Sequence, residues 1–497
     1  MKKRSLTAIL LLSLLALNAA ACGAEASPAE EKEAGSDAPV SEAVTEEEYN
    51  PYAERLKVSA GLPEGLDFGG MSFRTDVNEG DNGNPIPKDI YMENQTGDVV
   101  DDTIYARNMH VEELLNVRIE PSVVLSTGDA ANYVRKAVSA GDDILDVHLS
   151  HMINTGGVAL NGIFLNWYDV PYVDFKHEWY PQYSIKELTI NDVMFLTMSD
   201  IMISSIHNTY CMYFNKDLAE DYDIGDVYSV VKDGKWTLDK MIELSKPLYK
   251  DLNGDGTQDV ADQYGYATSI GSNVVTFFWS FRVPLIEASA DGVKLVANNP
   301  KAVDTVSRLR DYFYSSGTVF ITDVWTDFPK MFNAGQVLFI PRCVGETQTL
   351  FRETENYGII PFPKYDEAQD AYYTMLDGCS PVMAVPKTAS NLEMIGAVME
   401  AMGEYSYKYL YPAYYDVALK VKGTRDETSI EMLDLIMEGR LVDFAFVYDN
   451  FKGFSFTLQD LLKKNATQDF ASYYAKKEKS VQKHYDSVLK AFLEAND

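Results

Sequence analysis

The sequence predicts an α/β protein in which short strands alternate with amphipathic helices. Short runs rich in β-branched and aromatic residues recur along the chain, and stretches with helical periodicity separate them. We expect strands at 71–77, 117–125, 143–149, 193–202, 209–214, 337–341, 357–361 and 381–386. Because helices then connect successive strands, this alternation predicts α/β layers with largely parallel sheets.

Three stretches carry apolar residues at helical spacing. Residues 101–116 and 299–314 each place four or five apolar side chains on one face, as in Ile104, Val111 and Leu115 of the first. Such a stripe predicts a helix with one face in the core. The stretch from about 466 to 494 is a longer polar helix with one apolar stripe, which we expect to pack on the body of the protein.

The N-terminus is expected to be a signal peptide that ends before a lipidated cysteine. Three cations at 2–4 precede an apolar run over 6–17, too short for a bilayer core that needs roughly 20 residues. The small residues 19–21 and Cys22 resemble the bacterial lipobox, with alanine three positions before the cysteine, where leucine is commonest. We predict that 1–21 are removed and that lipid, palmitate included, on Cys22 anchors the protein outside the membrane. The alternative is an ordinary secretory signal.

Composition bounds the rest of the chain. Residues 22–65 are acidic and poor in large apolar residues, which predicts a disordered tether. The remaining roughly 430 residues could form two to three domain equivalents, and 46% hydrophobic and 12% aromatic residues provide for sizeable cores. A formal charge of −32 repels nucleic acid and anionic lipid, so a neutral or cationic ligand fits better than an anionic one.

The three cysteines after Cys22 indicate neither a zinc site nor a disulfide framework. Cys211, Cys343 and Cys379 are odd in number and have no CxxC spacing. We expect buried single thiols, with one bridge between Cys343 and Cys379 left open.

Several motifs occur in a fixed order along the chain. They are MYFNKDL at 212–218, GKWT at 234–237, FNAGQVLF at 332–339, YGIIPFP at 357–363 and SPVMAVPK at 380–387, preceded by Gly141, Asp142, Asp143 and Asp146. In order and spacing this series resembles the extracellular solute-binding proteins (family 1, sugar-binding type) of bacterial ABC importers. The resemblance covers roughly residues 66 to 490.

The resemblance implies a two-lobed, periplasmic-binding-protein-like fold whose lobes close on a ligand by hinge motion. By analogy, lobe 1 comprises 66–206 plus 381–440, and lobe 2 comprises 213–378 plus 441–497. Hinge crossings are then expected near 205–212 and 378–381. The implied partners are a small-molecule solute and the permease subunits of an ABC importer.

Candidate ligand contacts combine aromatic faces, which stack on sugar rings, with polar groups that bind hydroxyls. Position in the family pattern nominates His148, Ser150, His151, Arg342 and the segment from Asp377 to Cys379. Aromatic residues near those segments add Tyr210, Trp279, Trp325 and Tyr373. A metal pair of His148 and His151 is a further hypothesis, but the sequence offers no third ligand.

One acidic loop has the spacing of a calcium site. Oxygen-bearing residues and a glycine stand at positions 1, 3, 5, 6, 7, 9 and 12 of such a loop: Asp251, Asn253, Asp255, Gly256, Thr257, Asp259 and Asp262. Asp262 replaces the usual bidentate glutamate, and Gln258 replaces an apolar residue. We predict a structural Ca²⁺; the alternative is an Asx-rich surface turn.

The sequence therefore favours a lipid-anchored receptor that captures a neutral solute, a carbohydrate or oligosaccharide, for an ABC permease. We expect no enzymatic activity, because GxSxG, HExxH and P-loop motifs are absent from suitable contexts. Paired carboxylates carry no weight among 75 acidic residues. The alternatives are a surface-anchored carbohydrate-active enzyme and an adhesion lipoprotein.

Overall fold

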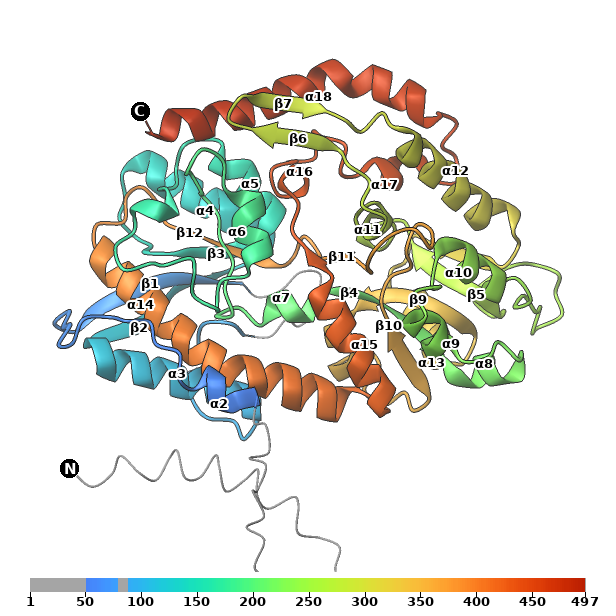
Figure 1. Ribbon diagram of the computed structural model, residues 1–497, viewed down its shortest axis with the longest axis horizontal. Helices are drawn as coiled ribbons and strands as arrows, with labels where there is room; N and C mark the ends of the chain where they lie inside the picture. The colour runs from blue at the N-terminus through green and yellow to red at the C-terminus, as the bar shows by residue number, and fades with distance from the viewer. Residues whose placement is uncertain (1–50, 79–87, 497) are drawn as a thin grey trace, which may run out of the picture. The chain divides into compact units, whose positions relative to one another are not determined.

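The computed structural model describes residues 51–78 and 88–496, which form two lobes built on separate sheets (Figure 1). The predicted signal peptide, Cys22 and most of the expected tether lie outside these residues. Within the described part of the chain, no helix is long and apolar enough to cross a bilayer.

The first lobe contains four strands. β1 (Met71–Asn78) is parallel to β2 (Val117–Leu125), and a bridge between Thr75 and Val147 brings β1 beside β3 (His148–His151). β3 is antiparallel to β12 (Pro381–Ala384). The helices of this lobe are α2 (Pro51–Arg55), α3 (Val99–Leu115), α4 (Thr127–Ala140), α5 (Met152–Ala159), η1 (Trp167–Asp169), α6 (Gln182–Leu188), α14 (Leu392–Tyr405), and the π-helical η3 (Ser406–Leu410) and η4 (Ala413–Val421).

The second lobe contains a five-stranded sheet in the order β10-β4-β9-β5-β8. Its strands are β4 (Tyr210–Asn215), β5 (Tyr264–Ser269), β8 (Val319–Thr322), β9 (Val337–Cys343) and β10 (Tyr357–Ile360). Around it lie α8 (Lys216–Asp221), α9 (Val227–Lys232), α10 (Leu238–Ser245), α11 (Ser272–Ser280), the hairpin β6 (Ile286–Ser289) and β7 (Gly292–Leu295), α12 (Pro300–Ser315), α13 (Asp327–Asn333), η2 (Val344–Gln348), α15 (Glu427–Glu438), α17 (Thr457–Leu461), α18 (Phe470–Leu493) and η5 (Glu494–Asn496).

The α/β prediction is confirmed, but the expectation of largely parallel sheets is wrong. β4 is antiparallel to both β9 and β10, and β12 is antiparallel to β3. Both β4 and β12 begin directly after the chain crosses from the other lobe. No helix connects them to a preceding strand of the same sheet, so the crossing sets their direction. The strand expected at 193–202 is reduced to single bridges, one of them between Thr197 and Met383 beside β12.

The chain passes between the lobes three times, and the three segments lie side by side. α7 (Ser204–His207) precedes the first segment, where Thr209 bridges to Leu376 and Asn208 accepts a 2.8 Å hydrogen bond from the Asp377 N–H. β11 (Thr374–Met375) in the second segment is parallel to β13 (Arg440–Leu441) in the third, which leads into α16 (Phe444–Val447). These pairings hold the crossing segments together, and the segments carry Tyr210 and Asp377, two of the predicted ligand contacts.

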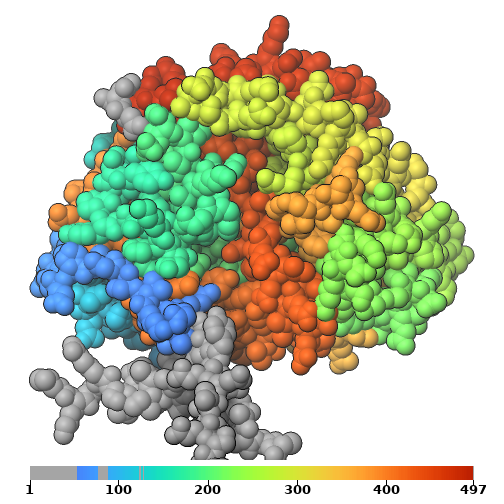
Figure 2. Space-filling model, viewed as in Figure 1, coloured from blue at the N-terminus to red at the C-terminus, as the bar shows by residue number. Residues whose placement is uncertain are grey.

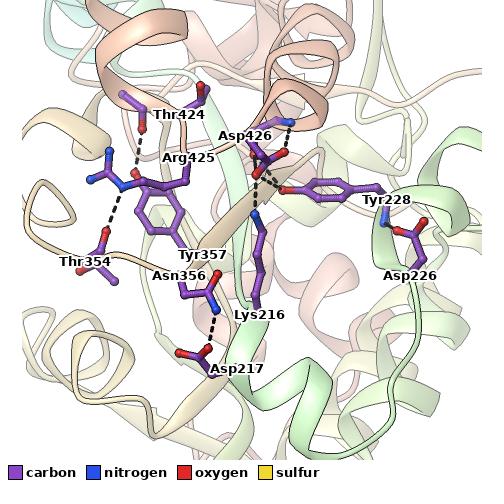
Figure 3. Close-up of polar contacts among 12 residues, drawn as sticks. Lys216, Asp217, Asp226, Tyr228, Thr354, Asn356, Tyr357, Thr424, Arg425 and Asp426 are labelled. Carbon is purple, nitrogen blue, oxygen red and sulfur yellow. Dashed lines mark hydrogen bonds and ion pairs between the residues drawn. The ribbon is translucent and has the colours of Figure 1, made fainter.

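Helix α15 packs on β10 of the second lobe, although its residues fall in the range expected for lobe 1. Figure 3 shows the attachment: Lys216 forms an ion pair with Asp426, the N-cap of α15, and the Tyr228 hydroxyl donates to the same carboxylate at 3.0 Å. The neighbouring Arg425 donates from Nε to the Thr354 carbonyl at 3.0 Å. The segment from α14 to α15 thus begins on one lobe and ends on the other.

Helix α18 packs on the body of the protein, as predicted, and it reaches both lobes. It contacts β7 and α12 of lobe 2 (Figure 1), and its last turn packs Phe492 against Phe195 of lobe 1 at 4.8 Å between ring centroids.

Part of the range expected to be a tether is held on lobe 1. Arg55 donates to the Tyr407 carbonyl at 3.1 Å, and the Ala60 N–H donates to the Glu404 carboxylate at 2.8 Å. These contacts join the start of the described chain to the end of α14 and to η3.

Candidate functional site

The surface is hollowed between the teal residues of lobe 1 and the yellow and orange residues of lobe 2 (Figure 2). Two of the crossing segments bring predicted ligand contacts together. The Tyr210 hydroxyl, at the start of β4, donates to Asp377 Oδ2 at 2.8 Å. Asp377 Oδ1 accepts from the Cys379 N–H at 2.8 Å, which fixes the carboxylate on its own turn.

A buried ion pair lies at the end of β9. Arg342 Nε donates to Glu346 Oε2 at 2.5 Å, and a second guanidinium nitrogen contacts the other carboxylate oxygen. The guanidinium lies over the Trp325 ring at 5.2 Å and the Phe328 ring at 5.5 Å from the centroids. Trp325 is half-buried, so its indole extends this arrangement toward solvent. We call Tyr210, Trp325, Arg342, Glu346 and Asp377 the inner site.

Two charges of the inner site, those of Arg342 and Glu346, balance each other. Burial raises the pKa of Glu346, and the Arg342 charge opposes that shift. Burial lowers the pKa of Arg342, but Glu346 more than offsets this and raises it above the ordinary value. Because the two groups satisfy each other bidentately, the pair offers a fixed polar surface with little net charge.

His207 is a buried neighbour of the Arg342–Glu346 pair. Burial and the Arg342 charge lower the pKa of His207 to about 4, so the imidazole is neutral at pH 7. Its Nδ1 lies 3.0 Å from the Tyr414 hydroxyl. Gly345 is required here, because a Cβ at that position would lie 2.0 Å from His207 Nδ1.

Polar atoms beside the crossings have capacity left for a ligand or water. Among the described residues, the hydroxyls of Ser150 and Ser380 and the Asn208 amide nitrogen are buried without a hydrogen-bond partner. Ser150 pairs with Val382 in the β3–β12 ladder, and Ser380 directly precedes β12. Buried polar groups are normally satisfied, so each of these atoms retains an unused hydrogen-bonding group.

Two predicted contacts belong to the packed interior instead. His148 is buried, with Nδ1 2.6 Å from Asp76 and Nε2 3.1 Å from the Thr155 hydroxyl, and its ring stacks on Phe164. Trp279 is buried in α11 and packs against Phe446 at 5.1 Å. Direct ligand contact by His148 and Trp279 is therefore not supported, because the ring nitrogens of His148 and the face of Trp279 are already occupied.

His151 is placed nearer the crossings than His148. It caps α5, and its Nδ1 accepts from the Asn154 N–H at 3.4 Å. A Cβ at Gly378 would lie 3.4 Å from the His151 ring, so the two segments touch. The hypothetical metal pair is not formed, because His148 is committed to Asp76, and no third metal-binding side chain joins the two histidines in the part of the chain that the structure describes.

Tyr373 lies apart from the inner site, in a pocket of about 520 Å³ that we call the outer pocket. Its lining is polar and comes from the turn after α11, from α12 and from the loop after β10: Arg282, Lys301, Asp366, Ala368, Gln369, Asp370 and Tyr373. Sequence reasoning missed Arg282 and Lys301 here, Glu346 in the inner site, and His207 next to it. Only Glu346 gave a signal, its i+4 spacing from Arg342.

The acidic loop at 251–262 is organised by its own side chains. Asp251 accepts from the N–H groups of Gly254 at 2.6 Å and Gly256 at 2.9 Å. Asp262 is buried and accepts from the Leu252 N–H at 3.1 Å. These contacts fold the predicted loop back on its first carboxylate.

The three cysteines after Cys22 form no disulfide with one another. Cys211 is buried, as expected, and Cys343 and Cys379 are half-buried. Burial raises the pKa of Cys343, which favours the protonated thiol at neutral pH.

Comparison with known proteins places this site in a family. The sequence model for the bacterial extracellular solute-binding protein family matches residues 111–399. The chain belongs to that family. No curated protein matches it in a sequence search. For this solute-binding protein, the family model and the solved structures with the same fold therefore provide the comparison.

Solved structures share the fold at low sequence identity. The galacto-N-biose/lacto-N-biose I-binding protein of an ABC transporter from Bifidobacterium longum has a TM-score of 0.58 at 10% identity, covering 85% of this chain and 98% of that one. The GacH receptor of Streptomyces glaucescens, solved with acarbose, has a TM-score of 0.50 at 12% identity, covering 86% and 98%. UgpB from Mycobacterium tuberculosis, solved with glycerophosphocholine, has a TM-score of 0.50 at 15% identity, covering 78% and 96%. These relationships confirm the two-lobed fold.

Proposed function

We propose that this solute-binding protein holds a saccharide in the inner site and delivers it to the permease of an ABC importer. The observation that carries the proposal is the inner site itself, where an aromatic face adjoins two fixed carboxylates and a guanidinium at the lobe crossings. Hydrogen bonds from this set suit hydroxyl groups, and the indole of Trp325 suits an apolar sugar face. Because Arg342 and Glu346 already neutralise each other, this pair does not require a charged group on the ligand.

Lobe closure is the proposed mechanism, with no covalent step. The crossing segments carry Tyr210 and Asp377, while β9 and η2 of lobe 2 carry Arg342 and Glu346. Closure around a bound solute would bring Ser150 and His151 of lobe 1 toward these groups and remove water from the cleft. The contacts of α18 and of the segment from α14 to α15 with both lobes limit how far that motion extends.

A thermal-shift screen tests this function. Neutral mono- and oligosaccharides, a glycerophosphodiester and short peptides are added to the purified protein, and we expect the midpoint to rise with a saccharide. Trp325→Ala should weaken the binding of that saccharide by up to ~10-fold, because the aromatic contact is lost. Phe451→Ala removes an exposed aromatic that is not part of the inner site and serves as the control. Stabilisation by peptides alone would reject a saccharide as the ligand. Cleavage of an added sugar would indicate an enzyme instead.

We further propose that lipid on Cys22 anchors the protein to the membrane. The lipobox-like segment before Cys22 supports this, and an acidic tether after it would let the lobes reach a permease. Detergent partitioning of the native protein and of Cys22→Ala gives the test. Partitioning into the detergent phase should be lost in the variant, whereas a native protein that stays in water would reject the anchor.

The loop at 251–262 is proposed to hold a structural Ca²⁺. Its support is the ligand spacing and the way Asp251 folds the loop. Calcium should raise the thermal midpoint of the protein and a chelator should lower it, and Asp251→Ala should abolish the difference. A midpoint that neither reagent moves would leave an Asx-rich turn.

A further inference from the structure

The outer pocket differs from the inner site in how its charges are arranged. Two cations, Arg282 and Lys301, face a pocket of about 520 Å³ on lobe 2. No carboxylate of the described chain lies within 4.0 Å of either cation. Each cation instead lies over a tyrosine ring, Arg282 at 5.0 Å from the Tyr373 centroid and Lys301 at 4.7 Å from that of Tyr365.

The two carboxylates of the lining are committed to their own loop. Asp366 Oδ1 accepts from the N–H groups of Ala368 at 3.0 Å and Gln369 at 3.1 Å. Asp370 accepts from the Ala371 N–H at 2.9 Å and from the Tyr373 hydroxyl. The carboxylates therefore shape the loop, and they leave the cations available to another anion.

The loop is also fixed in place relative to α11. Gln369 Nε2 donates to the Ser280 carbonyl at 2.9 Å and to the Ala371 carbonyl at 2.7 Å. Two residues beyond Ser280, Arg282 adopts a left-handed backbone with φ of 55°, where glycine is the usual residue after a helix. A cationic side chain is thus held at the pocket in spite of an unfavourable backbone.

The pKa of Lys301 responds to its burial and to charges of both signs in the lining. Burial lowers the pKa of Lys301, the Asp366 charge opposes that shift, and the nearby Arg282 adds to it. Two cations that repel each other across a pocket are both stabilised when an oxyanion binds between them.

We propose that the outer pocket binds an oxyanion, namely a carboxylate, sulfate or phosphate group carried by the solute. The idea that this group belongs to the transported solute rests on the saccharide function proposed above. Tyr373 and Asp377 are joined by an extended segment that includes β11, so the two sites lie about 13 Å apart along the chain at ~3.3 Å per residue. A saccharide several units long, uncharged in the inner site and acidic at one end, would span them. This replaces the sequence-based expectation of a wholly neutral solute.

Protection of Arg282 from arginine-specific labelling tests the proposal. The purified protein is treated with phenylglyoxal, and the Arg282 peptide is followed by mass spectrometry in chloride, sulfate, glucuronate or glucose, with ionic strength matched among the salts. We expect sulfate or glucuronate to slow labelling of Arg282 at least about threefold relative to chloride. Labelling of the exposed Arg118 and Arg352 should not change.

Matched lysine variants locate the second cation. Lys301→Gln should remove most of the protection at Arg282, whereas Lys294→Gln, on the nearby β7, should leave it unchanged. Equal protection by sulfate and glucuronate supports recognition of any oxyanion, and protection by glucuronate alone supports a sugar acid. Absence of protection, or equal protection at Arg118, would overturn the proposal.

These outcomes separate the oxyanion pocket from the saccharide function. If neutral saccharides raise the midpoint while Arg282 stays unprotected, the saccharide function stands and the oxyanion pocket fails. If anions protect Arg282 while no sugar raises the midpoint, the pocket stands and the saccharide function fails.

Discussion

The inner site and the outer pocket handle charge in opposite ways. In the inner site, Arg342 and Glu346 are both buried and pair bidentately. In the outer pocket, Arg282 is exposed and Lys301 half-buried, and neither pairs with a carboxylate within 4.0 Å in the described chain. Burial explains the difference, because a buried charge requires a partner whereas water can solvate an exposed one. The fold should therefore depend on the first set of charges far more than on the second.

Breaking the buried pair should have the largest effect. Arg342→Met leaves Glu346 buried without a partner, and we expect the free energy of unfolding to fall by ~3–5 kcal/mol. Urea unfolding measures the change. Arg308→Met removes an arginine from a pair whose aspartate is mostly exposed, and it should cost under ~1 kcal/mol. Equal losses in the two variants would contradict the comparison.

The next largest effect on stability should come from the titration of Asp443, a carboxylate on the third crossing segment. Burial and the Glu187 charge raise the pKa of Asp443 to about 7, and the Arg282 charge opposes the shift. Between pH 4 and 7 the folded protein holds a proton at Asp443 that the unfolded chain releases. This contribution to stability is present below about pH 4 and is lost as the pH rises through 7.

Asp443→Asn tests that sign. Asparagine does not titrate and can keep the cap of α16, so the variant should gain ~1–3 kcal/mol relative to the native protein as pH rises from 4 to 7. Urea unfolding at several pH values measures it. Asp226→Asn is the control: Asp226 also caps a helix, but hydrogen bonds from Ser229 lower its pKa, so no such gain should appear in this range. A pH-independent difference for Asp443→Asn would exclude the effect.

Much of the fold could be predicted from the sequence. The ordered motifs from 141 to 387 specify the family, and the helical periodicities at 101–116 and 299–314 correspond to α3 and α12. Local periodicity identifies these elements because each buries one face. The same signal could have excluded Trp279 from the ligand contacts: residues 274–279 in α11 are apolar on all sides apart from Thr276, as in a fully buried helix.

The functional sites could be predicted only in part, because tertiary contacts assemble them. Tyr210 and Asp377 were expected separately, and only the pairing of two crossings shows that they share a hydrogen bond. The outer pocket joins Arg282, Lys301 and a loop about 70 residues later in the chain, so no local pattern could reveal it.

Removing one hydroxyl from the inner site should have a smaller effect than breaking its ion pair. Tyr210→Phe deletes the hydrogen bond to Asp377, and we expect ~1–2 kcal/mol less stability because the acceptor is charged. Tyr448→Phe is a matched control, since the buried Tyr448 hydroxyl has no hydrogen-bond partner among the described residues. Thermal unfolding of both variants provides the measurement. A loss in Tyr448→Phe as large as in Tyr210→Phe would show that packing, not the hydrogen bond, is responsible.

The smallest effect on stability should come from substitutions of Arg282 in the outer pocket. Its sign shows whether arginine at this position stabilises the fold or is kept for its charge. Arg282 occupies a left-handed backbone conformation that costs a residue with a Cβ about 1 kcal/mol relative to glycine. Arg282→Gly and Arg282→Ala both delete the guanidinium, but only glycine relieves the backbone. We expect the glycine variant to be ~0.5–1 kcal/mol more stable than the alanine variant, as measured by urea unfolding. Greater stability of the glycine variant than of the native protein would mean that arginine is kept at this position for its charge. If alanine proved the more stable, the left-handed backbone would not be a cost that the cation imposes.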